Sequence, residues 1–324
     1  MKALKRLVLS RRWPERIESL LEKDYEVWPN THDQPMSAAA MRQALRKADG
    51  ICPTVTDRLD ARVLQVPSPR TRILANFGVG FEHIDLDFAR SAGIVVTNTP
   101  DVLTDCTADL AMALILATAR GLVRGDRMLR AGDWPGWRPM HIPGVRVSGK
   151  TLGLVGFGRI GKAVARRAGQ GFGMRVRIFT PRPPGRDEAE ELGVEICASL
   201  DDLLMSSDFV SLHCPVTPQT AGLMGEAQFA RMQPGAILIN TARGALVDEY
   251  ALVEALRAGR LGGAGLDVYE HEPVVPAALR EMDRVVLLPH LGSATRETRE
   301  AMGMRVKKNL DHFFAGEEPP DRVA

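Results

Sequence analysis

Residues 152–161 carry the clearest information about the fold, and they read Leu-Gly-Leu-Val-Gly-Phe-Gly-Arg-Ile-Gly. An apolar strand runs directly into a G-x-G-x-x-G turn, after which residues 162–167 continue as a helix. In this setting Gly156 permits the tight turn, Gly158 lets the backbone approach a pyrophosphate, and Gly161 allows close packing of helix and strand. The helix N-terminus adds unpaired N–H groups and partial positive charge. The stretch therefore predicts a dinucleotide-binding strand–turn–helix unit.

On both sides of this unit, short apolar strands alternate with helical patterns. Strands are expected at 7–9, 25–28, 50–52, 72–76 and 93–97, and again at 152–156, 175–180, 209–213, 236–240, 262–267 and 285–289. Helices are expected at 15–22, 37–48, 105–120 and 294–314. Such alternation is typical of parallel sheets covered on both faces. The expected fold class is therefore α/β, with two doubly wound, parallel-sheet, Rossmann-like domains and a cleft between them.

The order of these elements suggests the domain boundaries. The nearly all-apolar helix at 105–120 is expected to be buried and to cross between the domains. We expect the helix at 294–314 to pack back onto the first domain, which makes that smaller domain discontinuous. The expected domains are residues 1–99 plus 291–324, which are flavodoxin-like, and residues 100–290, which form the dinucleotide-binding Rossmann domain. The acidic, proline-containing tail from Glu317 is expected to be loose.

The composition excludes several classes of function. The 324 residues include 42 Lys and Arg against 40 Asp and Glu, a formal net charge of +2, so no strong field attracts nucleic acid or an acidic membrane surface. The four cysteines lie far apart without metal-ligand spacing, which indicates reduced thiols and no metal. The most apolar segment, residues 110–119, is about half as long as a membrane span. We therefore expect a cytoplasmic protein without nucleic-acid or membrane partners.

The strand at 175–180 ends without the acidic residue that binds the ribose 2′-hydroxyl in an NAD site. It ends instead in Thr180-Pro181-Arg182, about 20–25 residues after the first glycine of the turn. Arg182 is suited to a charge-assisted hydrogen bond with a 2′-phosphate, and Thr180 adds a hydroxyl. This pattern favours NADP over NAD, and the alternative is a solvated loop arginine.

Three further strands end in residues that suit the reduction of a keto acid. Arg243 follows the strand at 236–240, Glu272 follows that at 262–267, and His290 follows that at 285–289. Ligands of open α/β sheets bind at such carboxyl ends. Hydride transfer to a carbonyl carbon builds negative charge on its oxygen, which requires a proton donor and a cation. Histidine donates near neutral pH, a carboxylate on its other nitrogen favours the imidazolium, and arginine binds a carboxylate bidentately.

Each of these three residues has an alternative interpretation. Arg243 is also suited to capping a helix or pairing with Asp248, and Glu270 competes with Glu272 as the carboxylate partner. His290 has the alternative of a satisfied buried histidine. His213 lies at a similar strand end. His83 and His271 are expected at the surface.

These segments, together with residues 96–104 and 76–80, resemble the D-isomer-specific 2-hydroxyacid dehydrogenase family, its glyoxylate/hydroxypyruvate reductase branch in particular. The resemblance covers nearly the whole chain. It implies that Arg243 is the substrate-binding catalytic arginine, His290 the acid/base and Glu272 its carboxylate partner. It also implies that the backbone N–H groups of Val79 and Gly80 receive the substrate carboxylate. The cofactor-binding residues it implies are Thr104, Gly156, Phe157, Gly158, Arg159, Ile160, Gly161, Thr180, Pro181, Arg182, Cys214, Pro215, Thr220, Thr241, Ala242, Asp267 on the nicotinamide side, His290 and Gly292.

By this resemblance the first domain binds the substrate, and the enzyme reduces a small 2-keto acid with NADPH, or with NADH as the other possible cofactor. Glyoxylate, giving glycolate, and hydroxypyruvate, giving D-glycerate, are the leading substrates. The irregular stretch 132–140 contains Trp134 and Trp137, and a similar loop in the branch limits substrate size across a homodimer, so Trp137 is a substrate-binding candidate. The alternatives are a 2-ketogluconate-type reductase and a dinucleotide-sensing, corepressor-like binding protein. Glu272, where a formate-oxidising relative has a neutral amide, argues against formate.

Overall fold

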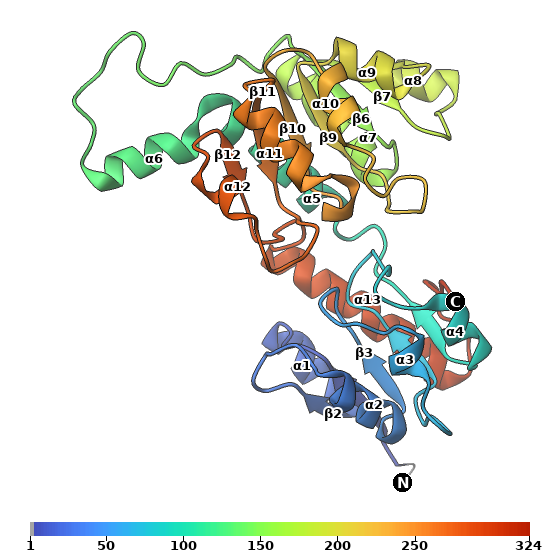
Figure 1. Ribbon diagram of the computed structural model, residues 1–324. Coiled ribbons are helices and arrows are strands. Elements are labelled where there is room, and N and C mark those ends of the chain that lie inside the picture. Colours follow the sequence, from blue (N-terminus) through green and yellow to red (C-terminus); the bar gives the residue numbers. More distant parts are fainter. Residues whose placement is uncertain (1–2) are drawn as a thin grey trace. The chain divides into compact units, whose positions relative to one another are not determined.

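Parallel strands form two separate sheets in the computed structural model, which describes residues 3–324 (Figure 1). The chain divides into two units, each with its own sheet. Unit 1 comprises residues 3–103 together with Ala294–Ala324, and unit 2 comprises Thr104–Ser293. Helices cover the sheets, and the doubly wound, parallel α/β fold expected from the sequence is confirmed.

The sheet of unit 1 has the strand order β2-β1-β3-β4-β5, the flavodoxin-like order, and its neighbouring strands are parallel. Helix α2 illustrates why its helices form, because Ser37 caps the N-terminus and Met41 and Leu45 lie buried one turn apart. The strands are β1 (Lys5–Leu9), β2 (Tyr25–Pro29), β3 (Gly50–Cys52), β4 (Ile73–Ala75) and β5 (Val95–Thr97). The helices are α1 (Glu15–Leu21), α2 (Ala38–Lys47), α3 (Ala61–Leu64), α4 (Leu86–Ser91) and α13 (Arg296–Ala315).

The tail after Glu317 is fixed in unit 1, so the expectation of a loose tail was wrong. The buried carboxylate of Asp321 accepts two hydrogen bonds of 2.6 Å from Arg305 in α13. The carbonyl oxygen of Ala324 accepts the N–H of Val96 at 2.9 Å. Strand β5 lies at the edge of its sheet, and the tail satisfies backbone groups that this edge leaves open. Acidic and proline-rich composition gave no sign of either contact.

The sheet of unit 2 has the strand order β12-β11-β10-β9-β6-β7-β8, in which β6 and β9 mark the point where the chain reverses its direction of winding. The strands are β6 (Thr151–Val155), β7 (Arg175–Phe179), β8 (Val194–Ile196), β9 (Phe209–Leu212), β10 (Ala236–Asn240), β11 (Leu261–Leu266) and β12 (Val285–Leu287). The helices are α5 (Thr104–Arg120), α6 (Leu122–Ala131), α7 (Arg159–Arg166), α8 (Arg186–Leu192), α9 (Leu200–Ser206), α10 (Glu226–Arg231), α11 (Glu249–Arg257) and α12 (Ala277–Glu281).

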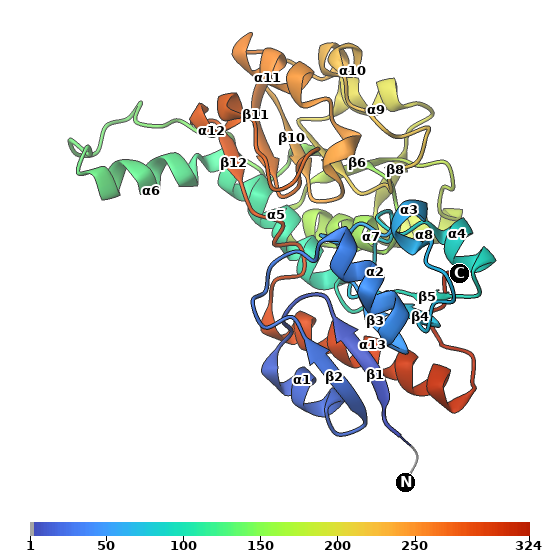
Figure 2. The same ribbon diagram turned by 60° about the horizontal axis from the view of Figure 1, so that its bottom comes forward.

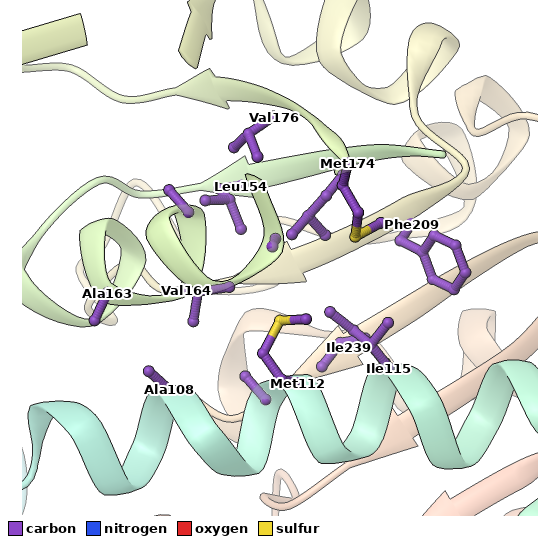
Figure 3. Packing of buried hydrophobic residues seen from close by; sticks show 14 of the residues in the cluster. Ala108, Met112, Ile115, Leu154, Ala163, Val164, Met174, Val176, Phe209 and Ile239 are labelled. Carbon is purple, nitrogen blue, oxygen red and sulfur yellow. The ribbon is translucent and has the colours of Figure 1, made fainter. Parts of the chain in front are cut away.

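Helix α5 packs against one face of this sheet, as its apolar sequence predicts. Figure 3 shows Met112 and Ile115 of α5 directed toward Ile239 of β10, with Val164 of α7 in the same cluster. The exposed side of α5 is tied to the end of α7, because Arg167 donates to two α5 carboxylates at 2.9 and 2.6 Å, those of Asp105 and Asp109. Helix α7, which follows the G-x-G-x-x-G turn, is therefore held against α5.

Residues 122–145, called the arm below, extend away from the body of unit 2 (Figures 1 and 2). Helix α6 in the arm was not expected from the sequence, and none of its side chains is buried. The arm exposes large apolar side chains, which are Leu122, Val123, Leu129, Trp134, Trp137, Met140 and Val145. A cavity of about 440 Å³ opens at its base, lined by parts of α5, the arm and the start of β10 and β12.

Within residues 3–324, no single helix is both long and apolar enough to cross a membrane. Only α5 and α6 taken together reach the required length and composition, and they are bent by 63° at their junction. The same part of the chain brings together no group of three or more His, Cys, Asp or Glu side chains suited to a metal ion.

Candidate active site

The three glycines of the β6–α7 turn differ in what surrounds them. Gly156 has a φ of 96°, and a Cβ there would lie 2.7 Å from the Cys214 nitrogen. A Cβ on Gly161 would lie 2.6 Å from the Gly156 oxygen, so both positions require glycine for packing. A Cβ on Gly158 would meet nothing within 4 Å, and α7 begins there without a side-chain cap. This open, uncapped helix end suits a pyrophosphate.

After β9 the chain forms a closed turn next to a neutral histidine. Thr220 Oγ1 donates to the Pro215 oxygen at 2.7 Å and accepts the Thr217 N–H at 2.8 Å. Burial lowers the pKa of His213 to about 4, and its Nε2 lies 2.9 Å from Ser211 Oγ. Burial also raises the pKa of the Cys214 thiol to about 11. His213 therefore backs the glycine turn as an uncharged residue, unsuited to proton donation at neutral pH.

The β7 end presents a cation and a hydroxyl. The Arg182 side chain is exposed and has no ion-pair partner within residues 3–324, and the Arg182 N–H lies 3.4 Å from Thr180 Oγ1. The nearest acidic helix, α8, directs Glu188 to Lys162 of α7 instead. A ribose phosphate placed here would find a free guanidinium.

His290 and Glu272 form a hydrogen-bonded pair at the ends of β12 and β11. His290 Nδ1 lies 2.8 Å from Glu272 Oε2, and each side chain is about one third exposed, at 31% and 32%. Partial burial alone would raise the pKa of Glu272, but the hydrogen bond and charge of His290 lower it. The competing carboxylate, Glu270, lies 4.0 Å from His271. It is therefore Glu272 that orients the His290 ring.

The loop that carries His290 is held in a sparsely populated backbone conformation. His290 has a φ of 56°, in the left-handed region, and its N–H donates to the Asp267 oxygen at 2.9 Å. The fully buried Asp267 carboxylate accepts the N–H groups of Leu291 and Gly292 at 2.6 and 2.8 Å. Burial raises the pKa of Asp267 despite these bonds. Asp267 thus fixes this loop with both carboxylate oxygens.

Arg243 follows β10 on a turn that Asn240 closes. Asn240 Oδ1 accepts the Ala242 N–H at 3.0 Å, and its Nδ2 donates to the Arg243 oxygen at 2.8 Å. The positive charge of Arg243 is among the influences that lower the pKa of Glu272. Thr241, only 7% exposed, has an Oγ1 with no hydrogen-bond partner within residues 3–324, and such an orphaned hydroxyl suits a bound ligand.

In unit 1, the loop at 76–80 directs its carbonyl groups inward. Asn76 Nδ2 donates to the oxygens of Gly78 and Gly80 at 3.0 and 2.8 Å, and Asn98 Nδ2 donates to the Val79 oxygen at 2.8 Å. The N–H groups of Val79 and Gly80 have no acceptor among the described residues. Two adjacent unpaired N–H groups are suited to binding an anion.

Two contributors to these sites were not anticipated. His83 is not the surface residue expected from the sequence, because it is partly buried with Nε2 3.1 Å from Asn76 Oδ1. Tyr269 donates its N–H to Glu272 at 3.2 Å and its hydroxyl to the Leu288 oxygen at 2.9 Å. An aromatic residue directly after a strand is the only signal that would have indicated Tyr269.

The other residues predicted to bind the cofactor lie in or next to the segments described above. Phe157, Arg159 and Ile160 belong to the glycine turn or the first residues of α7, and Pro181 belongs to the loop with Arg182. Gly292 lies in the Asp267-bound loop, where its carbonyl accepts the Thr107 hydroxyl at 2.8 Å. Thr104 begins α5, partly buried. Thr241 and the open Gly158 fit a nicotinamide dinucleotide.

A Rossmann sheet with a glycine turn and a histidine–carboxylate pair defines the class as a nucleotide-dependent oxidoreductase. The model of the D-isomer specific 2-hydroxyacid dehydrogenase NAD-binding domain matches residues 112–292. The chain is 45% identical to the glyoxylate reductase of Thermococcus litoralis, over 98% of this chain and 96% of the relative. It is 46% identical to the glyoxylate reductase of Aeropyrum pernix, over 96% of this chain and 93% of the relative.

Solved structures agree with this assignment. An NADPH-dependent glyoxylate/hydroxypyruvate reductase from Sinorhizobium meliloti, in complex with NADP and malonate, matches with a TM-score of 0.87 and 36% identity, over 99% of this chain and 97% of the other. The holo D-mandelate dehydrogenase of Rhodotorula graminis matches with a TM-score of 0.88 and 31% identity, over 99% and 98%. The chain belongs to the D-isomer specific 2-hydroxyacid dehydrogenase family, in its glyoxylate reductase branch, and is an NAD(P)-dependent oxidoreductase.

Proposed function

We propose that this enzyme reduces glyoxylate to glycolate and hydroxypyruvate to D-glycerate, with NADPH as the preferred cofactor. The observation that carries the proposal is the 2.8 Å bond between His290 and Glu272 at the carboxyl ends of the strands that follow the glycine turn. The names of the similar relatives, glyoxylate reductases, support the choice of substrate.

A nicotinamide dinucleotide held at the β6–α7 glycine turn would supply a hydride for C2 of the keto acid. Negative charge then develops on the C2 oxygen, and His290 donates a proton to that oxygen from its Nε2. Glu272 keeps the ring oriented through Nδ1, which leaves Nε2 to the substrate. Arg243 binds the keto acid through its carboxylate and polarises the carbonyl. Val79 and Gly80 are proposed as further donors to a substrate carboxylate, because their N–H groups have no acceptor among the described residues.

The cofactor preference rests on Arg182. A 2′-phosphate gains a charge-assisted bond from its guanidinium, whereas the 2′-hydroxyl of NADH finds no carboxylate at the end of β7. Gly158, the uncapped end of α7 and the unpaired hydroxyl of Thr241 are the groups proposed to receive the rest of the dinucleotide.

The proposal includes a homodimer formed through the arm. Helix α6 buries none of its side chains, and Trp137 is 79% exposed, which leaves a large apolar surface that a second copy would cover. Trp137 is then the residue proposed to limit the size of the substrate.

The test is a set of initial rates with glyoxylate, hydroxypyruvate and 2-ketogluconate, each with NADPH and with NADH. We expect glyoxylate and hydroxypyruvate to be reduced faster than 2-ketogluconate, and NADPH to be preferred. Arg182→Ala should raise the KM for NADPH about tenfold or more without changing that for NADH, since one charge-assisted bond is lost. Arg186→Ala removes an equally exposed arginine paired with Glu190 and is the control.

Three outcomes would contradict parts of this proposal. Equal or faster turnover with NADH would contradict the role of Arg182 in cofactor preference but would not change the enzyme class. Preference for 2-ketogluconate would assign the longer substrate. Tight binding of NADPH with no turnover of any keto acid would instead favour a dinucleotide-sensing protein.

A further inference from the structure

Helix α11 starts with two acidic residues that do different things. Asp248 is the N-cap, and its Oδ1 accepts the N–H of Ala251 at 3.0 Å. Because Asp248 already caps the helix, the next carboxylate is not needed for that purpose. Glu249 instead turns to a segment 21 residues away, where its Oε1 accepts the N–H of Glu270 at 3.0 Å.

The peptide between Tyr269 and Glu270 is contacted twice by the segment that follows β10. Gly244 packs directly against it, since a Cβ there would lie 1.9 Å from the Tyr269 carbonyl carbon and 2.3 Å from the Glu270 nitrogen. Glu249 then bonds the N–H of the same peptide. The stretch that carries Arg243 and the stretch that carries Glu272 are therefore joined at this one peptide.

The preceding peptide, between Val268 and Tyr269, contacts Glu272 directly. The N–H of Tyr269 donates to Glu272 Oε1 at 3.2 Å, while Glu272 Oε2 lies 2.8 Å from His290 Nδ1. A shift of the 269–270 backbone therefore moves the carboxylate that orients His290. Glu249 contacts none of the reacting groups, but it holds the backbone segment that positions Glu272.

The environment of Glu249 shows that its placement has an energetic cost. Burial raises the pKa of Glu249, the Glu270 N–H lowers it, the nearby Glu270 carboxylate raises it and His271 lowers it. A glutamate that only favoured the helix dipole would remain in solvent, as Glu254 of the same helix does in its exposed ion pair with Arg257. The hydrogen bond to the 269–270 peptide offsets this partial burial.

We propose that Glu249 is a positioning residue that fixes the Glu272–His290 pair through the Glu270 N–H, an inference that rests on the proposed function. The test compares Glu249→Leu with Glu249→Gln, whose amide oxygen still accepts the bond. Glu254→Leu is the matched control on the exposed side of α11. For each variant, kcat and KM for glyoxylate and for NADPH are measured across pH.

We expect Glu249→Leu to lower kcat about tenfold, the effect of one lost hydrogen bond to a charged group, with the KM for NADPH unchanged. The acidic limb of its pH–rate profile should move to higher pH, because a displaced Glu272 loses part of the His290 contact that lowers its pKa. Glu249→Gln should remain within about twofold of the parent, and Glu254→Leu should match the parent. A normal rate and profile in Glu249→Leu, or an equal loss in Glu249→Gln, would overturn the inference.

Amide hydrogen exchange of residues 269–272 gives a readout independent of turnover. Faster exchange at Glu270 in Glu249→Leu, but not in Glu249→Gln, would support the anchor even if the parent enzyme reduced no keto acid and the proposed function failed. Unchanged exchange at Glu270 would overturn the inference whatever the activity.

Discussion

Glu272 remains charged although its side chain is only about one third exposed, because His290 donates to it and Tyr269 adds a backbone N–H. Its lowered pKa and the orientation of the His290 ring are therefore two results of one contact. A charged carboxylate in this place holds Nδ1 of the ring and leaves Nε2 for proton transfer.

Replacing this carboxylate should affect the pH dependence as well as the rate. We expect Glu272→Gln to lower kcat/KM for glyoxylate roughly 10- to 100-fold, since a charge-assisted bond is weakened. The contact with His290 lowers the pKa of Glu272, so the parent should lose activity on the acid side as Glu272 takes up a proton. A glutamine takes up no proton, so this acidic limb of the reduction profile should be absent in Glu272→Gln. Steady-state rates across pH measure this. Glu270→Gln, two residues away, should change neither the rate nor the profile, and an unaltered acidic limb in Glu272→Gln would contradict the assignment.

The sequence predicted the types of residue at the candidate site, but not in every case which residue each of them contacts. Arg243, Glu272 and His290 were predicted because each follows a strand of a parallel sheet. The choice between Glu272 and Glu270 depends on the path of an irregular loop, for which no periodicity exists. Only the 2.8 Å contact with His290 distinguishes them.

In the β6–α7 turn, the fold requires Gly156 and Gly161, whereas Gly158 is open to a ligand. Gly158→Ala adds a methyl group to open space at a φ of −78°, so the folded protein should be as stable as the parent. That methyl group would occupy the place proposed for the pyrophosphate, so the KM for NADPH should rise about tenfold or more. Thermal unfolding and cofactor titration together check this. Gly161→Ala, which meets the Gly156 oxygen at 2.6 Å, should instead lose stability. Equal behaviour of both variants would contradict the distinction.

Elements with strong patterns were predictable, and short or exposed ones were not. The strand expected at 236–240 agrees with β10, and the apolar helix at 105–120 begins only one residue earlier, at Thr104. Strand β8 was missed because it has three residues, two of them exposed. Helix α6 was missed because it buries no side chain within unit 2 and has no apolar face against a core.

The stability of the folded chain should depend on His213, the half-buried histidine behind the glycine turn. The pKa of His213 is about 4 when folded, against an ordinary 6.5, so the unfolded chain binds a proton first as the pH falls. The free energy of unfolding should therefore decline by about 3 kcal/mol between those values because of this group. Denaturant unfolding of His213→Asn should show a shallower decline over that window, though a slightly lower stability at neutral pH. Parallel curves for parent and variant would contradict the burial of a neutral ring.

The assembly of the whole molecule should depend on the arm, because α6 exposes an apolar face that no part of unit 2 covers. Leu129 is 60% exposed there, and Leu129→Arg should convert a dimer to a monomer, as measured by sedimentation, since a buried unpaired charge is costly at an interface. Met205→Arg changes a similarly exposed apolar residue on α9, at 50%, and should leave the dimer intact. Trp137→Ala should raise the rate with larger keto acids relative to glyoxylate. If Trp137→Ala left both substrate profile and assembly unchanged, and Leu129→Arg remained as large as the parent, the arm would not be the dimer surface.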